Sequence, residues 1–215
     1  MTYVLIPGAG CTSWHWHPVT DELRRRGRDV VAVDLPCEDP SAGLTEYVDA
    51  VVDAVGTRTD LVVVAHSLGG FTAPLVCDRL PVRLLVLVAG MIPAPGETFR
   101  NWWANTRYVD ESTEPDPFFH DLPPELAGEA ERQLRNQSGG AEDEPWPAPA
   151  WPDVPTRFVL GRDDQFFSAD FLRRVARERL ELEPDEVPGG HFPMLGHPVE
   201  VANRLEAYRA AVRAF

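Results

Sequence analysis

Short runs of apolar, largely β-branched residues alternate along this chain with stretches of helical periodicity. The runs lie at residues 3–6, 29–33, 61–65, 84–89 and 157–160, with a weaker one at 182–187. Strands buried on both faces are almost continuously apolar, which is typical of parallel sheets. The helical stretches lie between and after them, at 16–26, 44–55, 69–80, 169–180 and 199–212. This alternation predicts an α/β fold in which a mostly parallel sheet of about six strands is flanked by helices.

One long stretch, from Met91 to Asp153, interrupts the alternation. It contains ten of the 21 prolines and four of the six tryptophans, and its 13 acidic residues outnumber its four arginines. So much proline disfavours regular helices throughout, whereas the aromatic content is high for a linker. We therefore expect residues 93–153 to form a lid inserted after the fourth predicted strand, over a core of residues 1–92 and 154–215. A surface excursion, partly disordered at 111–117 and 138–149, is the alternative.

The charge balance limits the possible partners. All 20 basic residues are arginines, and 34 acidic residues give a net charge of −14, which disfavours nucleic acid and anionic membrane surfaces. The absence of lysine from the sequence excludes Schiff-base chemistry and a phosphate-loop lysine. No apolar run approaches the ~18 residues of a membrane span. With three cysteines, no C-x-x-C pair and no secretory signal, the sequence favours a cytoplasmic location. It leaves the oligomeric state open.

The strongest chemical motif is the run LVVVAHSLGG from Leu61 to Gly70. A serine at a tight strand-to-helix turn takes a strained backbone conformation, and small residues two positions before and after it let neighbouring chains approach. Ala65 and Gly69 occupy these positions around Ser67. The turn would lift the Ser67 hydroxyl above the sheet as a nucleophile, at the N-terminus of the next helix. An ordinary turn with Ser67 as a helix N-cap is the alternative.

A serine nucleophile needs a base, and the base needs an orienting carboxylate. His191 follows two glycines between the last weak strand and the C-terminal helix, which makes it the best candidate base. Asp163 and Asp164 both come directly after the predicted strand at 157–160, so either can lie beside His191. The chain order of serine, acid and histidine is the order expected for a nucleophile elbow.

The negative charge that forms on a carbonyl oxygen under attack needs hydrogen-bond donors. The backbone N–H of Leu68 follows the nucleophile, and the N–H of Ala9 lies in a glycine-rich loop after the first strand. Substrate contacts are expected from the residues around these groups and from the lid: Gly8, Trp14, His66, Trp102, Trp103 and Phe192.

Taken together, the motifs resemble the α/β-hydrolase superfamily, most closely its small esterase branch, which also contains plant methyl esterases and hydroxynitrile lyases. The resemblance covers the chain except the lid, and its ordered segments are PGAG (7–10), AHSLGG (65–70), GRDD (161–164) and GGH (189–191).

The resemblance implies an α/β-hydrolase fold and roles for five residues. Ser67 would be the nucleophile, His191 the base, and Ala9 and Leu68 the oxyanion donors. Asp164 is favoured over Asp163 as the acid, because the family acid typically stands third after the glycine that ends the strand. The implied activity is hydrolysis of a small neutral or apolar ester or thioester through an acyl-enzyme, without metal or cofactor.

Other functions compete with this interpretation. The Gly8-Ala9-Gly10 run, with Asp34 after the next strand, imitates an NAD(P)-binding fingerprint, although Ser13 stands at its third small position. The lyases of the branch use a loop threonine and a lysine, where this chain has Gly8 and no lysine. A receptor of the same fold with little turnover would keep the same residues.

Two local motifs have alternative uses as well. His15 and His17 could hold a metal, although no further well-spaced ligands accompany them. Cys11 adjoins the predicted oxyanion loop and is a weaker candidate nucleophile.

Overall fold

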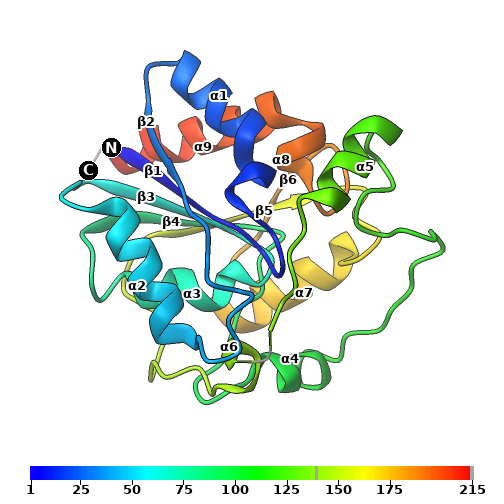
Figure 1. The fold of residues 1–215 in the computed structure, drawn as a ribbon, viewed down its shortest axis with the longest axis horizontal. Helices are drawn as coiled ribbons and strands as arrows, with labels where there is room; N and C mark the ends of the chain where they lie inside the picture. Colours follow the sequence, from blue (N-terminus) through cyan, green and yellow to red (C-terminus); the bar gives the residue numbers. More distant parts are fainter. Residues whose placement is uncertain (139, 214–215) are drawn as a thin grey trace.

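The sheet is the centre of the protein, whose computed structural model describes residues 1–138 and 140–213 (Figure 1). Among these residues six strands form one sheet in the order β2-β1-β3-β4-β5-β6, and every neighbouring pair is parallel. The strands are β1 (Thr2–Ile6), β2 (Asp29–Ala32), β3 (Leu61–His66), β4 (Val82–Val88), β5 (Thr156–Gly161) and β6 (Asp185–Val187). The predicted α/β class and parallel sheet are confirmed.

Helices cover both faces of this sheet (Figure 1). One face carries α1 (His17–Arg25), α8 (Pro193–Gly196) and α9 (Pro198–Arg213), and the other carries α2 (Leu44–Val55), α3 (Gly69–Val76) and α7 (Ala169–Leu180). A short 3-10 helix, Ser13–Trp16, precedes α1. None of these described helices has the length and apolar character needed to span a bilayer.

Alternate residues of each strand belong to different cores, because side chains in a strand point to opposite faces. Tyr3 and Leu5 pack under α1 and α9, whereas Val4 and Ile6 pack against the α2, α3 and α7 side. Every residue of β1 and β3 is buried. This two-sided burial is why the central strands are continuously apolar in the sequence.

Helix α3 ends at Val76, four residues before the predicted boundary at 80. Pro74 lies inside its last turn and has no N–H to donate. The chain continues in tighter turns, in which Cys77 N–H donates to Pro74 O and Arg79 N–H donates to Val76 O.

In the segment between β4 and β5 the described residues form the short helices α4 (Phe99–Asn105), α5 (Pro124–Arg132) and α6 (Gly140–Asp143). Trp102 and Trp146 are completely buried in the core, and their indole N–H groups donate to Ile92 O and Phe71 O at 3.0 Å. The range 138–149, where disorder was the alternative, contains α6 and the buried Trp146, while Gly139 is outside the described residues.

Different parts of this segment pack against the two cores. The α4 and α6 helices lie together on the α3 side, whereas α5 lies apart from them near α8 (Figure 1). Ala130 of α5 and Leu122 before it belong to the core under α1 and α9. The segment therefore wraps the edge of the sheet where the carboxyl ends of the strands lie.

Candidate active site

Ser67 occupies the sharp turn between β3 and α3. Its φ of +47° places the serine in the left-handed region, which is strained for a residue other than glycine. The Ser67 N–H donates to Val88 O at 3.2 Å, and the Ser67 carbonyl accepts from Gly70 N–H and Met91 N–H at 3.0 and 2.9 Å. Backbone hydrogen bonds to β4 and to the chain after it therefore hold the strained turn in place.

The second and third residues after Ser67, Gly69 and Gly70, must be small because neighbouring backbone passes against them. A Cβ added at Gly69 would lie 2.7 Å from Pro7 O, and one added at Gly70 would lie 1.9 Å from Met91 O. The first approach brings the loop after β1 beside the elbow, as the motif predicts. The sequence analysis did not identify the second approach.

Ser67, His191 and Asp164 form one hydrogen-bonded chain. His191 Nδ1 donates to Asp164 Oδ2 at 2.8 Å, which leaves Nε2 to accept from the Ser67 hydroxyl at 3.2 Å. The His191 and Asp164 side chains are buried. The other carboxylate oxygen, Asp164 Oδ1, accepts the N–H groups of Phe166 and Phe167 at 2.8 and 2.9 Å.

The structure distinguishes between the two adjacent aspartates. Asp163 Oδ2 accepts the N–H of Gly189 at 3.3 Å, and the Asp163 N–H donates to the Gly189 carbonyl at 3.0 Å. Asp163 therefore contacts the backbone of the loop that carries His191, whereas Asp164 contacts the imidazole.

A cavity of about 200 Å³ opens above Ser67 and His191. Its other lining residues are mostly aromatic or apolar: Ala9, Cys11, His66, Leu68, Met91, Phe99, Trp103, Phe118, Phe166 and Phe192. Ala9 and Leu68 are among these lining residues, and in the described part of the chain neither of their N–H groups donates a backbone hydrogen bond. Within that part both amides are therefore without a backbone acceptor beside the cavity.

Three of the six predicted substrate contacts, His66, Trp103 and Phe192, line this cavity. Gly8 does not line it but lies next to two residues that do, since a Cβ at Gly8 would be 2.9 Å from His66 Nδ1 and 3.0 Å from Ser67 Cβ. Trp14 packs on the His17 ring, with centroids 4.6 Å apart, and the Trp102 side chain is enclosed in the core.

The prediction of direct contacts therefore has no support at Gly8, Trp14 or Trp102. Composition identifies an indole but not the face of a short helix on which it lies, and on α4 it is Trp103 that faces the cavity.

The sequence analysis missed several lining residues. Phe166 had a usable signal, since it stands two residues after Asp164 on a loop that leaves the same edge of the sheet. No sequence signal identifies Phe99 and Phe118 as lining residues, because their positions at the cavity depend on how the segment between β4 and β5 packs.

His66 supports the loop that carries the candidate base. Its Nε2–H donates to the backbone carbonyl of His191 at 2.9 Å. Burial, with a smaller contribution from the charge on His191, lowers the pKa of His66 well below its usual range. The His66 ring is therefore neutral at pH 7 and acts as a fixed donor.

The alternative uses of nearby residues fit the structure less well. Burial raises the pKa of Cys11 to about 12, which keeps the thiol protonated and a poor nucleophile. The two Asp34 carboxylate oxygens accept the N–H and hydroxyl of Ser13 at 2.7 and 3.1 Å. This pairing occupies the carboxylate that an NAD(P) site would use for a ribose.

The histidines proposed as metal ligands have protein partners. His15 Nε2 donates to Ala130 O at 3.2 Å, and His17 Nδ1 donates to Trp14 O at 2.8 Å. In the described residues no group of three or more His, Cys, Asp and Glu side chains is arranged to hold a metal ion.

Comparison with known proteins places this chain in a family. The sequence model of the alpha/beta hydrolase family matches residues 3–204. A protein of Oryza sativa subsp. indica named Probable esterase PIR7A is 33% identical over 107 residues, which cover 44% of this chain and 41% of that protein. The chain thus matches less than half the length of this curated relative.

Two solved structures share the fold over nearly their whole length. Polyneuridine aldehyde esterase has a TM-score of 0.82 and 18% identity, over 96% of this chain and 98% of that one. A pyrethroid hydrolase from Sphingobium faniae has a TM-score of 0.80 and 20% identity, over 100% and 99% of the two chains. The family match, on a parallel sheet with helices on both faces, shows that the chain belongs to the alpha/beta hydrolase family, and its relatives lie in the esterase branch.

Proposed function

We propose that the protein is a serine hydrolase that cleaves a carboxylic ester or thioester of a small neutral or apolar substrate through an acyl-enzyme. The observation that carries this proposal is the buried hydrogen-bonded chain from Ser67 Oγ through His191 to Asp164. Its serine end lies in an apolar cavity that Ala9 and Leu68 also line, and the backbone N–H groups of these two residues have no backbone acceptor among the described residues. The names of the relatives, an esterase of rice and polyneuridine aldehyde esterase, support the ester class.

In the acylation step, Ser67 Oγ attacks the carbonyl carbon while its proton moves to His191 Nε2. The electron pair of the carbonyl bond moves to oxygen, and the N–H groups of Ala9 and Leu68 bind the resulting oxyanion. Asp164 stabilises the imidazolium through the 2.8 Å contact to Nδ1. Collapse of the intermediate breaks the ester bond, and His191 returns the proton to the leaving alkoxide or thiolate.

Water completes the cycle by the same route. His191 Nε2 takes a proton from a water molecule that attacks the acyl carbon, and the oxyanion again occupies the two amides. When the second intermediate collapses, the bond to Ser67 Oγ breaks and His191 returns the proton to the serine. The carboxylic acid leaves, and no metal or cofactor takes part in these steps.

The cavity wall supports a neutral, apolar acyl group. Phe99, Trp103, Phe118, Phe166 and Phe192 surround a small volume, and none of the lining residues carries a carboxylate. The segment 93–153 supplies three of these five aromatics, which supports its role as a lid. Its excess of 13 acidic residues over four arginines also disfavours the approach of an anionic substrate.

The test is covalent labelling followed by a substrate panel. A fluorophosphonate should label the wild-type protein at Ser67, and Ser67→Ala should abolish the label while Ser112→Ala, on an exposed loop, leaves it unchanged. The unlabelled wild-type protein should hydrolyse members of a panel of aryl esters, methyl esters, lactones and acyl thioesters, and prior labelling should abolish this activity. Labelling that persists in Ser67→Ala overturns the nucleophile, and labelling without turnover of the panel favours the receptor alternative.

A further inference from the structure

The loop that carries Ala9 is a tight turn. Cys11 N–H donates to Gly8 O at 3.2 Å, which closes residues 8–11 into a β-turn, and Gly10 at its third position has a φ of +63°. This is the sign pattern of a type II turn, which needs glycine at that place. We call residues 8–11 the oxyanion turn, because Ala9 faces the cavity from its second position.

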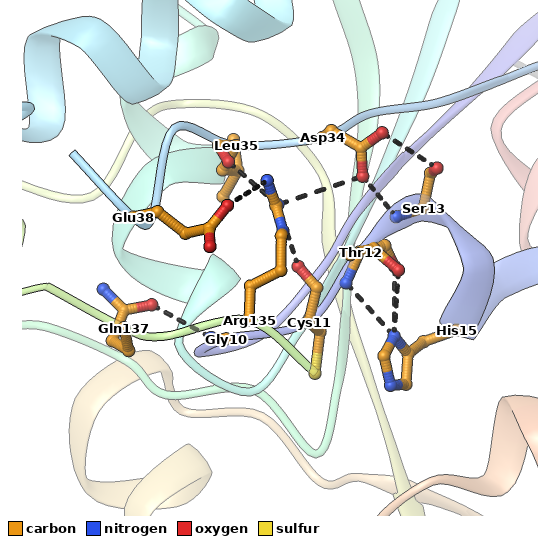
Figure 2. Close-up of polar contacts among 10 residues, drawn as sticks. All are labelled: Gly10, Cys11, Thr12, Ser13, His15, Asp34, Leu35, Glu38, Arg135 and Gln137. Atoms are coloured by element: carbon orange, nitrogen blue, oxygen red, sulfur yellow. Dashed lines mark hydrogen bonds and ion pairs between the residues drawn. The ribbon is translucent and has the colours of Figure 1, made fainter. Parts of the chain in front are cut away.

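Both hydrogen-bonding groups of Gly10 contact the segment between β4 and β5. The Gly10 N–H donates to Gln137 Oε1 at 3.0 Å, and the Gly10 carbonyl accepts the N–H of Arg135 at 2.7 Å. A Cβ added at Gly10 would lie 2.7 Å from Arg135 O, so the two backbones touch. Figure 2 shows Gln137 and Arg135 beside Gly10 and Cys11 of the oxyanion turn. In the sequence these contacting residues are more than 120 positions apart.

Residues 135–138, here called the strap, are anchored outside the turn. Gln137 Nε2 donates to the Tyr47 hydroxyl of α2 at 3.0 Å, and Ser138 N–H donates to Cys37 O at 2.7 Å. Arg135 Nη2 donates to Leu35 O at 3.0 Å and reaches Cys11 O at 3.4 Å (Figure 2). The strap is therefore held by the loop after β2 and by α2, independently of its hydrogen bonds to the oxyanion turn.

These contacts bear on rate because an oxyanion hole works by preorganisation. Its donors must point at the developing charge before the reaction begins, and a misplacement of about 1 Å can lower the rate about 100-fold. A glycine-rich turn has wide conformational freedom, and the central peptide of such a turn can flip between type I and type II. An acceptor fixed on the Gly10 N–H removes that freedom.

We propose that Gln137, supported by Arg135, is a positioning residue for the oxyanion turn. It touches neither substrate nor reacting atoms, and it acts on the Ala9 N–H through Gly10. The inference rests on the proposed function, since only an enzyme that stabilises an oxyanion gains rate from a fixed turn.

The test compares two substitutions at one position. Gln137→Met keeps the length of the side chain and removes the acceptor, and it should lower kcat by about 10-fold to 100-fold with KM within about twofold of wild type. The rate at which a fluorophosphonate labels Ser67 should fall in parallel. Gln137→Glu keeps an acceptor for Gly10 and an oxygen that accepts from the Tyr47 hydroxyl, so it should stay within about threefold of wild type on both measures.

A glutamine on the same segment provides the matched control. Gln133 Nε2 donates to Glu129 Oε1, and within the described residues no hydrogen bond joins Gln133 to the oxyanion turn, so Gln133→Met should keep wild-type kcat and labelling rate. If Gln137→Met unfolds below the assay temperature, Gln137→Asn replaces it. That variant keeps the amide but shortens its reach by one methylene, and the same loss of kcat is expected.

Each outcome decides for or against the inference. If the variants lacking the acceptor keep wild-type kcat, or raise KM alone, the positioning role is overturned while the proposed function stands. A rate in Gln137→Glu as low as in Gln137→Met also overturns it. A wild-type protein that neither reacts with fluorophosphonate nor hydrolyses esters overturns the proposed function, and the inference with it.

Discussion

Asp164 Oδ2 lies 2.8 Å from His191 Nδ1, on the side of the ring opposite Ser67, and its other oxygen is held by two backbone amides. The amides come from Phe166 and Phe167, two and three residues after the aspartate. The carboxylate therefore has a fixed orientation before it meets the imidazole, and it defines which ring nitrogen carries the proton.

This geometry predicts a large difference between neighbouring substitutions. Asp164→Asn replaces the acceptor of Nδ1–H and favours the wrong tautomer, so kcat for ester hydrolysis should fall by about 10³-fold to 10⁴-fold. Asp163→Asn keeps an oxygen that accepts from Gly189 N–H, so it should lower kcat by less than about tenfold. Steady-state kinetics on one ester, with circular dichroism to verify folding, measures both, and the reverse ranking would assign the acid to Asp163.

The close approach behind the elbow predicts a loss of stability. In Gly70→Ala the new methyl group would overlap Met91 O, so the free energy of unfolding should fall by about 2 kcal/mol or more. Gly128→Ala in α5 is the matched control, since its Cβ meets only Arg132 Nη1 at 3.6 Å and alanine favours a helix by about 0.5–1 kcal/mol. Urea unfolding followed by tryptophan fluorescence compares the two, and equal stabilities would contradict the packing argument.

Burial of His66 predicts a dependence of stability on pH. Its folded pKa is lowered, so as pH falls below the unfolded value of about 6.5 the unfolded chain binds a proton that the folded protein does not. The stability contributed by neutral His66 is therefore present above about pH 6.5 and is lost toward lower pH, by up to about 1.4 kcal/mol per pH unit.

Replacing the ring isolates this effect. His66→Gln keeps a donor for His191 O and removes the titration, so its free energy of unfolding should change less steeply than that of wild type between about pH 5 and 6.5. Urea titrations at several pH values give the two slopes. If wild type and His66→Gln have the same slope, His66 does not contribute to the pH dependence of stability.

The position of Phe118 predicts a change in substrate preference. Phe118 is 37% exposed and lines the cavity, so Phe118→Ala should widen the cavity without a large loss of stability. The ratio of kcat/KM for a bulky acyl ester to that for an acetyl ester should rise by about tenfold, the usual size of a hydrophobic pocket effect. Val109→Ala, at an exposed position that does not line the cavity, should leave the ratio unchanged. If Phe118→Ala has the same ratio as wild type, the acyl group of the substrate does not bind against Phe118.

The features that local sequence could predict are those with local causes. Burial on both faces makes β1 and β3 continuously apolar, and helices Leu44–Val55 and Ala169–Leu180 match their predicted bounds because each has a single apolar stripe. Ser67, Asp164 and His191 each stand in a loop directly after a strand, so the parallel order of the sheet brings them together.

The remaining parts of the site depend on contacts between distant segments. The faces of Trp102 and Trp103 follow from how α4 lies against the core, and no pattern within its seven residues separates the two indoles. The bond from Gly10 to Gln137 spans 127 positions, and neither residue stands in a motif that predicts the other. The sequence therefore predicts that residues 93–153 are rich in aromatic side chains, but it does not predict that this segment is hydrogen-bonded to Gly10.

The strap also sets a limit on modular engineering of this protein. A chimaera that takes residues 93–153 from a relative would replace Phe99, Trp103 and Phe118, and at the same time would remove Gln137 from Gly10. Selectivity and turnover would then change together, and one could be mistaken for the other. A chimaera that keeps residues 133–140 of this protein and exchanges only the parts of the segment before and after them would retain the hydrogen bond from Gly10 to Gln137. The exchanged parts would then alter the acyl pocket alone.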